Sequence, residues 1–517
     1  MSNSGQVVGI DLGTTNSVVA FVDDSGEAHA IAGREGERIV PSVVWFPQDD
    51  ETRVEVGELA KGQAVIDPDH VAKLFKRGMG SSTFLDSKQP FVARAKEWRP
   101  EELSSLVLKK MVQIASDHLG HEVKDVVITV PAYFGEAERS ATRQAGEMLG
   151  LTVHALPAEP MAAAVAHGLD ADTSARRFLV FDLGGGTFDV TILERHGDGQ
   201  LEAKSHHGDR RLGGADFDRL IVARMTDMAL REHGVRLDAD PVDLAEAFAK
   251  AEQLKKELSN RERAQSALIA GGKRMTFGLT RAEFEGMLAE HLQNVELAVE
   301  TCLDNVDMTA ADIDAVLMVG GSSRIPAFQD LLRRYFSKEP QYSRNLDEDV
   351  ARGAALVGAL KTGTAAPSSP LASLPAPVDR SSHAIGVTAL NDAGIEGNFV
   401  VLPANAQIPT PEPAEQTFGC AADGQTEIDL TVNEGDEFEL KFVDRLGSAT
   451  GKLGSPKPKG YPITVRMALD GDGILHVTAH DGNSGALITK VDVHREGAMT
   501  EQQQTDAMAA LDDVLVI

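Results

Sequence analysis

Two short glycine turns carry the residue types that hold phosphate. One is DLGTT at 11–15 and the other is DLGGGT at 182–187, and each follows one apolar run and precedes another. Glycines let backbone amides approach phosphate oxygens, threonine hydroxyls add donors, and an aspartate at a strand end can hold hydrated Mg²⁺. Either motif alone is compatible with an ordinary tight turn between buried strands. Their repetition in matched surroundings favours two hairpin turns that hold one nucleotide from both sides.

A third glycine turn, VGGSSRIP at 319–326, leaves the expected strand 315–319 and enters a helix. Pro326 suits the first turn of that helix, because the missing N–H has no partner to lose there. The free amides of the turn suit a nucleoside or a phosphate. The alternative is an ordinary strand-to-helix connection.

Charged residues elsewhere could complete a phosphate site. Lys76, in LFKRGMG, could neutralise developing phosphate charge, although an exposed helical lysine is the common alternative. Glu159 precedes a proline and the helix expected over 161–168, where it could orient water or simply cap the helix. The helix AEQLKKELS places four polar residues on one face, which is otherwise typical of a solvated surface: Glu252, Lys255, Lys256 and Ser259.

The elements that must position these residues alternate between strand and helix. Apolar β-branched runs at 126–130 and 178–181 alternate with helical patterns such as 101–119, which indicates α/β layers over residues 1–362. The segment 363–379, GTAAPSSPLASLPAPVD, is rich in proline and disfavours helix. We therefore expect an α/β domain over 1–362 followed by a linker over 363–380.

Beyond the linker the hydrophobic period changes to two. Alternation at 428–432, 438–442 and 463–469 predicts half-buried strands, and the turn DGDG at 470–473 leads into a further strand at 475–479. We interpret residues 381–498 as an antiparallel β-sandwich. Residues 499–517 are expected to form a short helix that Thr500 and Gln503 begin with an imperfect capping box, with Met508, Leu511 and Leu515 on one face.

Composition limits the possible functions. A length of 517 residues allows several domains, and a formal charge of -29 opposes binding to nucleic acid or anionic membranes. Two cysteines, Cys302 and Cys420, are too few for a disulfide framework and favour the reducing cytoplasm. No basic leader and no long apolar span is evident. A P-loop, a zinc-protease motif, a G-x-S-x-G elbow and an EF-hand loop are all missing, which leaves nucleotide hydrolysis or phosphoryl transfer.

The chain resembles the seventy-kilodalton heat-shock chaperones of the DnaK type, whose ATPase domain has the duplicated two-lobed actin fold. The resemblance covers nearly the whole length. It rests on six motifs in family order: GIDLGTTNS (9–17), VITVPAYF (127–134), EPMAAAVAHGL (159–169), FDLGGGTFDVTIL (181–193), GDRRLGGADFD (208–218) and VGGSSRIP.

This resemblance implies bound ATP or ADP with Mg²⁺. Asp11, Asp182 and Asp189 would support Mg²⁺ through water, and Lys76, Glu159, Thr187 and Asp189 would act in hydrolysis. The residues placed around the phosphates are Gly13, Thr14, Thr15, Gly184, Gly185, Gly186 and Thr187. Those placed near adenosine, ribose or phosphate are Glu252, Lys255, Lys256, Ser259, Gly320, Gly321, Ser322, Arg324 and Asp347.

NAQIPT (405–410) and GILHVTAHD (473–481) extend the resemblance into the β-domain. It implies a groove for an extended apolar segment of an unfolded client polypeptide, formed by Val387, Ala389, Leu390, Phe418, Ala421 and Ile428. The alternative for these residues is plain sandwich core. A J-domain co-chaperone is the further partner that the resemblance implies.

Two features depart from the family pattern. The Pro/Ala/Ser linker replaces an acidic, leucine-rich one, so the sequence does not predict how the nucleotide site and the sandwich communicate, although Pro131 and Arg139 match family relay positions. The family's helical lid needs many more residues than follow the sandwich here. We therefore interpret 499–517 as the remnant of a lid and expect bound peptide to escape quickly.

Two other functions remain open at this stage. A metabolic kinase of the same fold would show ATP turnover stimulated by a sugar or an acid rather than by peptide. An actin-like scaffold would form sedimentable polymer with ATP and would need no peptide groove. Peptide release measured with ATP and with ADP separates these alternatives from a chaperone.

Overall fold

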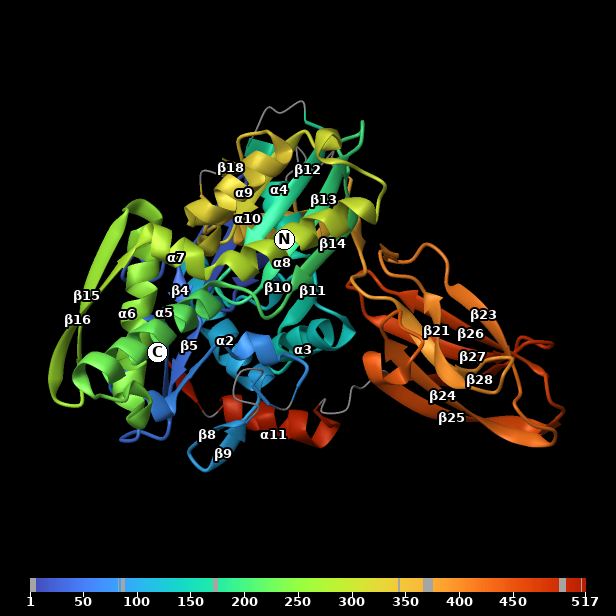
Figure 1. The fold of residues 1–517 in the computed structure, drawn as a ribbon. Coiled ribbons are helices and arrows are strands. Elements are labelled where there is room, and N and C mark those ends of the chain that lie inside the picture. The colour runs from blue at the N-terminus through green and yellow to red at the C-terminus, as the bar shows by residue number, and fades with distance from the viewer. Residues whose placement is uncertain are drawn as a thin grey trace.

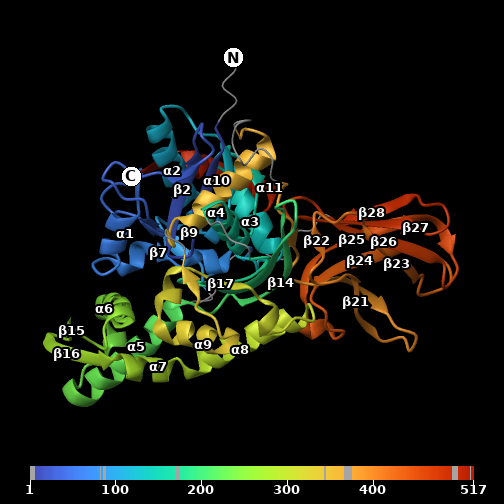
Figure 2. The same ribbon diagram turned by 90° about the horizontal axis from the view of Figure 1, so that it is seen from above.

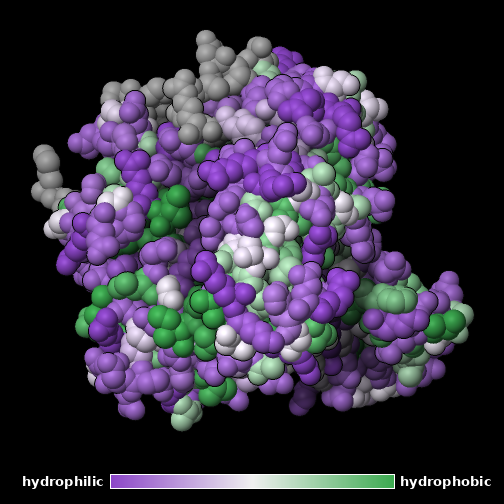
Figure 3. All heavy atoms as spheres, turned by 60° about the vertical axis from the view of Figure 1, so that its left-hand side comes forward, coloured by the Kyte–Doolittle hydropathy of each residue, from purple (hydrophilic) through white to green (hydrophobic). Residues whose placement is uncertain are grey.

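The computed structural model describes residues 6–81, 83–84, 89–170, 175–342, 345–365, 375–491, 499–512 and 514–517. Residues 366–374, half of the expected linker, lie outside the described residues. A two-lobed α/β domain occupies the first two thirds of the chain, and a β-sandwich projects from one side of it (Figures 1 and 2). The face drawn in Figure 3 is largely hydrophilic with separate apolar areas, as expected when charged side chains stay at the surface.

The first lobe is built on a six-stranded sheet in the order β11-β10-β1-β2-β3, with β4 also paired to β2. Its strands are β1 (Val8–Leu12), β2 (Asn16–Val22), β3 (Ala28–Ala30), β4 (Val40–Pro41), β10 (Asp125–Ile128) and β11 (Thr152–Ala155). A four-stranded sheet, β29-β6-β5-β7, lies beside it: β5 (Val43–Trp45), β6 (Arg53–Val56), β7 (Val71–Lys73) and β29 (Leu515–Val516). The lobe also holds the hairpin β8 (Phe91–Ala93)–β9 (Lys96–Trp98), the 3₁₀ helices η1 (Pro68–His70) and η2 (Phe75–Gly78), and the helices α1 (Glu58–Gln63), α2 (Pro100–Leu119), α3 (Glu136–Glu147) and α4 (Glu159–Asp170).

The second lobe repeats this plan. Its sheet has the order β14-β13-β12-β17-β18, formed by β12 (Arg177–Leu183), β13 (Phe188–Arg195), β14 (Leu201–Asp209), β17 (Ala315–Val319) and β18 (Gln341–Tyr342). In each lobe a hairpin strand pairs antiparallel with its successor and parallel with a later strand: β1 with β2 and β10, and β12 with β13 and β17. This confirms the duplicated, actin-like fold expected from the repeated turns.

The remaining elements of the second lobe are mostly helical. They are α5 (Gly214–Met228), the π-helical turn η3 (Ala229–His233), η4 (Leu237–Ala239), α6 (Pro241–Asn260), the hairpin β15 (Arg263–Ala270)–β16 (Lys273–Thr280), α7 (Arg281–Met287), α8 (Ala289–Asp304), η5 (Ala310–Asp312), η6 (Gly321–Arg324) and α9 (Pro326–Phe336). The chain then returns to the first lobe through α10 (Asp349–Thr362), which packs on β1 and α4. A Cβ on Gly9 would come within 2.1 Å of the Ala355 nitrogen, and one on Gly353 within 1.8 Å of the Ala162 carbonyl. Glycine at both positions therefore permits this close helix packing.

The sandwich consists of two four-stranded antiparallel sheets. One has the order β21-β20-β24-β25, from β20 (Ile385–Leu390), β21 (Glu396–Leu402), β24 (Gln425–Glu434) and β25 (Asp444–Lys457). The other has the order β23-β26-β27-β28, from β23 (Ala414–Gly419), β26 (Pro462–Leu469), β27 (Leu475–Asp481) and β28 (Leu487–Val491). The short strands β19 (Asp379–Arg380) and β22 (Gln407–Ile408) pair beside them. The expected sandwich and its DGDG turn are confirmed.

One predicted strand is wrong. Residues 438–442 alternate like a strand, yet they hold the 3₁₀ helix η8 (Leu440–Phe442), and Phe442 is 62% exposed. Asn398 of β21 binds this loop and the residues before it: its Nδ2 donates to the carbonyls of Gly435 and Glu437 at 2.9 and 3.3 Å, and its backbone N–H donates to the Phe438 carbonyl at 2.8 Å. The Phe438 ring packs against Phe399 at a centroid distance of 5.7 Å.

The expected helix near the end of the chain is α11 (Glu501–Asp512), and Thr500 and Gln503 form its capping box. The predicted buried face is partly wrong: Leu511 is buried, but Met508 is 42% exposed and Leu515 is 59% exposed in β29. The buried face comprises Ala507 and Leu511, and α11 packs on α2 of the first lobe. The interpretation of this segment as a lid remnant stays a prediction.

Candidate functional site

The two predicted phosphate turns face each other across the junction of the lobes. A Cβ added to Gly185 would lie 2.2 Å from Thr15 Cγ2, and one added to Gly186 would lie 2.3 Å from Thr14 Cγ2. The second turn is closed by a hydrogen bond from the Gly184 amide to the Thr187 carbonyl at 3.0 Å. The glycines therefore form a cradle that side chains would fill, with threonine hydroxyls on its opposite wall.

Two neighbouring cavities follow this junction. A narrow one of about 90 Å³ is lined by residues from both predicted turns and from the third: Asp11, Gly13, Thr14, Thr15, Glu159, Asp182, Gly184, Gly185, Thr187, Gly320 and Gly321. A wider one of about 510 Å³ is lined by Ser259, Arg324, Tyr342 and Asp347, among others. Both include Ile39, Leu346 and Asp347 in their walls, so they form one cleft with a narrow and a wide end.

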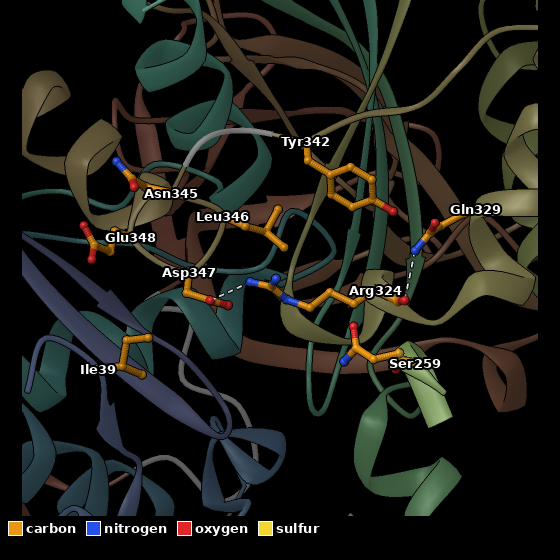
Figure 4. A pocket seen from close by; sticks show the side chains of 10 residues that line it. Ile39, Ser259, Arg324, Gln329, Tyr342, Asn345, Leu346, Asp347 and Glu348 are labelled. Atoms are coloured by element: carbon orange, nitrogen blue, oxygen red, sulfur yellow. Dashed lines mark hydrogen bonds and ion pairs between the residues drawn. The ribbon is translucent and has the colours of Figure 1, made fainter. Parts of the chain in front are cut away.

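Figure 4 shows the wide end, where Arg324 and Asp347 point toward one another. The Arg324 guanidinium bonds to the Asp347 carboxylate at 2.7 Å, and both side chains are about half exposed. Ser259 at the end of α6 and Tyr342 from β18 complete the surrounding wall. A volume of this size matches pockets that take small organic ligands, which are typically about 300–1,000 Å³.

Buried carboxylates surround the narrow end. Burial and the negative charge of Glu159 raise the pKa of Asp11 to about 7, while the positive charge of Lys76 acts in the opposite direction. Burial and Glu159 likewise raise the pKa of Asp189 to about 7 and that of Asp182 well above its usual range. Such a group of carboxylates is costly without a cation, because buried like charges repel one another.

Lys76 supplies positive charge at this point. It lies in η2, its side chain is 2% exposed, and its Nζ donates to Glu159 Oε1 at 2.6 Å. The alternative of an exposed helical lysine is therefore excluded. Glu159 begins α4, and its backbone N–H donates to the Val130 carbonyl at 2.8 Å, so its position is fixed from both ends.

Other predicted residues lie apart from the cavity. Lys255 is buried and donates to the Gly214 carbonyl and to Asp218 at 2.7 and 2.8 Å. Glu252 bonds to Lys256 at 2.5 Å and, across the lobes, to Lys61 at 3.1 Å. Burial opposes ionisation of Glu252, but these lysines outweigh it and lower its pKa to about 2. Ser322 is buried next to Gly214, where a Cβ would meet its Oγ at 2.6 Å.

The structure adds three residues that the sequence interpretation missed. Arg77 donates from Nε to the Gly186 carbonyl at 2.8 Å and also pairs with Asp216, so it supports the second turn from the opposite lobe. Thr129 donates to Asp11 at 3.2 Å, and the Tyr133 N–H donates to Asp189 at 2.8 Å. Arg77 follows Lys76 directly, and Thr129 and Tyr133 lie in the VITVPAYF motif, so the signals were present in the sequence.

The predicted peptide-groove residues divide into two groups. Val387 and Ile428 are buried in the sandwich core, as the plain-core alternative proposed. Leu390 is 51% exposed, Ala421 is exposed, and Ala389 and Phe418 are half-buried. Phe418 contacts Phe399 at a centroid distance of 6.1 Å, so a partly open aromatic surface exists at this end of the sandwich.

The sandwich contacts both lobes of the α/β domain directly. His383 shares a 3.2 Å hydrogen bond with the Tyr133 carbonyl, and Asp472 pairs with Arg143 and, at 2.9 Å, with Lys361. The N–H of Val378 donates to the Leu201 carbonyl at 2.9 Å, so the chain entering the sandwich lies along β14. Within the described part of the chain, no helix has both the length and the apolarity needed to cross a membrane.

A duplicated α/β fold with facing glycine turns, buried carboxylates and a paired lysine defines the actin-like nucleotide-hydrolysing class. The family model described as Hsp70 protein matches residues 7–513. Chaperone protein DnaK from Thermotoga neapolitana is 38% identical over 493 residues, which cover 93% of this chain and 79% of that relative, and the DnaK of Thermotoga petrophila gives the same values. The chain therefore belongs to the Hsp70 family of ATP-dependent chaperones, and it is an ATPase. Nothing found favours the kinase or the scaffold.

Proposed function

We propose that the cleft binds ATP with its phosphates at the narrow end and adenosine at the wide end. The apposition of Thr14 and Thr15 with Gly185 and Gly186 carries this proposal, because it leaves backbone amides and hydroxyls on both sides of one narrow space. Arg324 and Asp347 then lie beside the nucleoside. Ser259 and Gly321 complete that part of the site.

Mg²⁺ fits the buried acidic residues at the narrow end. Asp11, Asp182 and Asp189 supply the hard oxygen ligands that Mg²⁺ prefers, directly or through water, and burial together with the charge of Glu159 raises their pKa values. When bound, Mg²⁺ would neutralise phosphate charge. Thr129 and the Tyr133 amide hold two of these carboxylates in place.

Hydrolysis would use the Lys76–Glu159 pair together with Thr187. Glu159 accepts a hydrogen bond from the attacking water and orients it toward the γ-phosphorus, while Lys76 offsets negative charge on the phosphoryl oxygens. Thr187 donates its hydroxyl from the second turn, whose wall it forms. The bond between the γ-phosphorus and the bridging oxygen breaks, giving ADP and phosphate.

The sandwich would bind extended apolar segments of client polypeptides near Phe418, Leu390 and Ala421. Their partial exposure beside Phe399 supports this placement. A J-domain co-chaperone and the domain boundaries at 362, 380 and 498 belong to the same proposal. Calorimetry of the folded chain with Mg²⁺ and ATP tests the nucleotide site: we expect binding heat, and its absence would contradict the assignment. Peptide release measured with ATP and with ADP tests whether the two sites communicate.

A further inference from the structure

The segment that follows the sandwich returns to the first ATPase lobe. Met499, Ala507 and Leu511 are at most 5% exposed and belong to the same apolar core as Leu103 and Leu106 of α2. In Figures 1 and 2 the red helix α11 lies beside α2, although about 400 residues separate them in sequence. Residues 499–512 therefore complete a core that the first hundred or so residues begin.

The chain then adds a strand to the lobe. Leu515 and Val516 pair in parallel with Arg53 and Val54 of β6. The Leu515 N–H donates to the Thr52 carbonyl at 2.8 Å, the Ile517 N–H donates to the Val54 carbonyl at 3.0 Å, and the Val56 N–H donates to the Ile517 carbonyl at 3.0 Å. Without this strand the outer edge of β6 would expose unpaired backbone groups.

The side chains of the added strand alternate between buried and exposed, as they do in a strand with one face on a hydrophobic core. Val514 and Val516 are buried at 8% and 3% exposure, whereas Leu515 between them is 59% exposed. Lys109 of α2 fixes the junction of helix and strand, because its Nζ donates to the carbonyls of Leu511 and Val514 at 2.6 and 2.9 Å. A lysine in this position satisfies carbonyls that the end of α11 leaves without helical partners.

We propose that residues 499–517 form a strap that ties the chain leaving the sandwich to the first ATPase lobe. The chain entering the sandwich is already attached where Val378 pairs along β14 of the second lobe. The acceptor surface for the strap is the outer edge of β6 together with the adjoining face of α2. The chain is thereby fixed both before and after the sandwich, each time by a different lobe.

The strap limits how far the sandwich can move. Val491 ends β28, and Met499 is already seated in the lobe core. Seven residues lie between them, so the eight Cα–Cα steps, at about 3.6 Å each, can span no more than about 29 Å. While the strap is seated, the sandwich can leave its contacts around Asp472 but cannot move freely away from the lobes. A change in the relative position of the lobes would therefore pull on the chain both where it enters and where it leaves the sandwich.

Two pairs of variants of the full chain test the strap. L515P removes the N–H that bonds to the Thr52 carbonyl, while L515A keeps that N–H. Both variants lose the Leu515 side chain, which is exposed, so the difference between them reports the hydrogen bond. L511D places a charge in the core under α11, whereas M508D places the same charge on its exposed face. Hydrogen exchange at the Val56 amide reports the strand, and small-angle scattering with ADP reports the position of the sandwich.

We expect exchange at Val56 to become about tenfold faster in L515P and L511D than in their controls, since one hydrogen bond is lost. We also expect a larger radius of gyration in these two variants. Equal exchange and equal radius within each pair would overturn the proposal. Faster exchange with an unchanged radius would also overturn it, because the segment would then stabilise the lobe without restraining the sandwich. If L511D fails to fold, L515P decides, since it leaves the core side chains intact.

Discussion

The Nζ atom of Lys76 lies 2.6 Å from Oε1 of Glu159, and both side chains are buried beside three further carboxylates. The two residues are 83 positions apart in the sequence: Lys76 follows β7, and Glu159 begins α4. Its burial makes both partners depend on one another, because a buried charge without its partner is strongly unfavourable.

Replacing Lys76 by alanine should abolish ATP turnover and leave nucleotide binding largely intact. We expect turnover to fall by at least about 10²-fold, since charge stabilisation on the phosphoryl group is lost. Thr187→Ala should act in the same direction. Single-turnover hydrolysis and nucleotide titration measure the two effects, and Lys124→Ala, at an exposed ion pair, serves as the control.

The same substitution should also lower stability. Lys76→Ala leaves Glu159 buried without its partner, which typically costs about 3–5 kcal/mol. The double variant K76M/E159Q should recover much of that loss while remaining inactive. Denaturant unfolding of the three proteins checks this, and equal stability of the single and double variants would contradict the coupling.

Gly186→Ala should prevent the two turns from closing on each other. The added Cβ would lie 2.3 Å from Thr14 Cγ2, so one turn must move away from the other. We expect nucleotide affinity to fall by about tenfold or more, equivalent to about 1–3 kcal/mol of overpacking. Gly197→Ala is the matched control because nothing lies within 4 Å of its Cβ. Similar affinities of the two variants would contradict the facing arrangement.

The fold of the nucleotide domain follows from its sequence more directly than the ends of the sandwich do. The turns at 11–15 and 182–187 join adjacent strands in both lobes, and Pro326 begins α9, all as the local patterns predict. These features are determined by residues that are close together in the sequence. The apposition of Thr14 with Gly186 depends instead on how two lobes pack, which no local pattern contains.

Local patterns fail where a distant partner decides the structure. Residues 438–442 alternate like a strand, yet Asn398 binds the carbonyls of Gly435, Glu437 and Phe438, and the chain then forms a 3₁₀ turn. Leu515 has the spacing of a helical face with Leu511, but it joins β6, some 460 residues earlier in the chain. In both cases the sequence has the hydrophobic period of a regular element, but the structure that forms is decided by contacts with residues far away in the sequence.

Phe418→Glu should weaken peptide binding without changing basal ATP turnover. Phe418 is half-buried beside Phe399, and a carboxylate there would meet an apolar client segment. Thr417→Glu, on the adjacent exposed position of β23, adds the same charge away from that surface. Fluorescence titration with an apolar peptide measures the effect. An unchanged titration in Phe418→Glu would refute the groove assignment.

Docking of the sandwich should depend on pH through Glu136. This residue begins α3, and its backbone N–H lies 3.4 Å from the carboxylate of Glu434 in the sandwich. Burial, followed by the charges of Glu434, Glu138 and Asp470, raises the pKa of Glu136 to about 8, although a hydrogen bond with the Leu475 backbone acts in the opposite direction.

The sign of the effect follows from that pKa. A carboxyl whose pKa is raised by docking favours the docked form while it is neutral, and this contribution is lost as the pH rises from about 4.5 through about 8. We therefore expect contacts such as Asp472–Lys361 to loosen on the alkaline side of neutrality. In E136Q the carboxyl cannot ionise, so docking should be stronger above pH 7 and nearly independent of pH in this window. Hydrogen exchange near Asp472 between pH 6 and 9, corrected for intrinsic rates, measures the slope, and Glu147→Gln, at a half-exposed site later in α3, should keep the wild-type slope. A slope in E136Q equal to that of the unmodified chain would show that Glu136 does not govern docking.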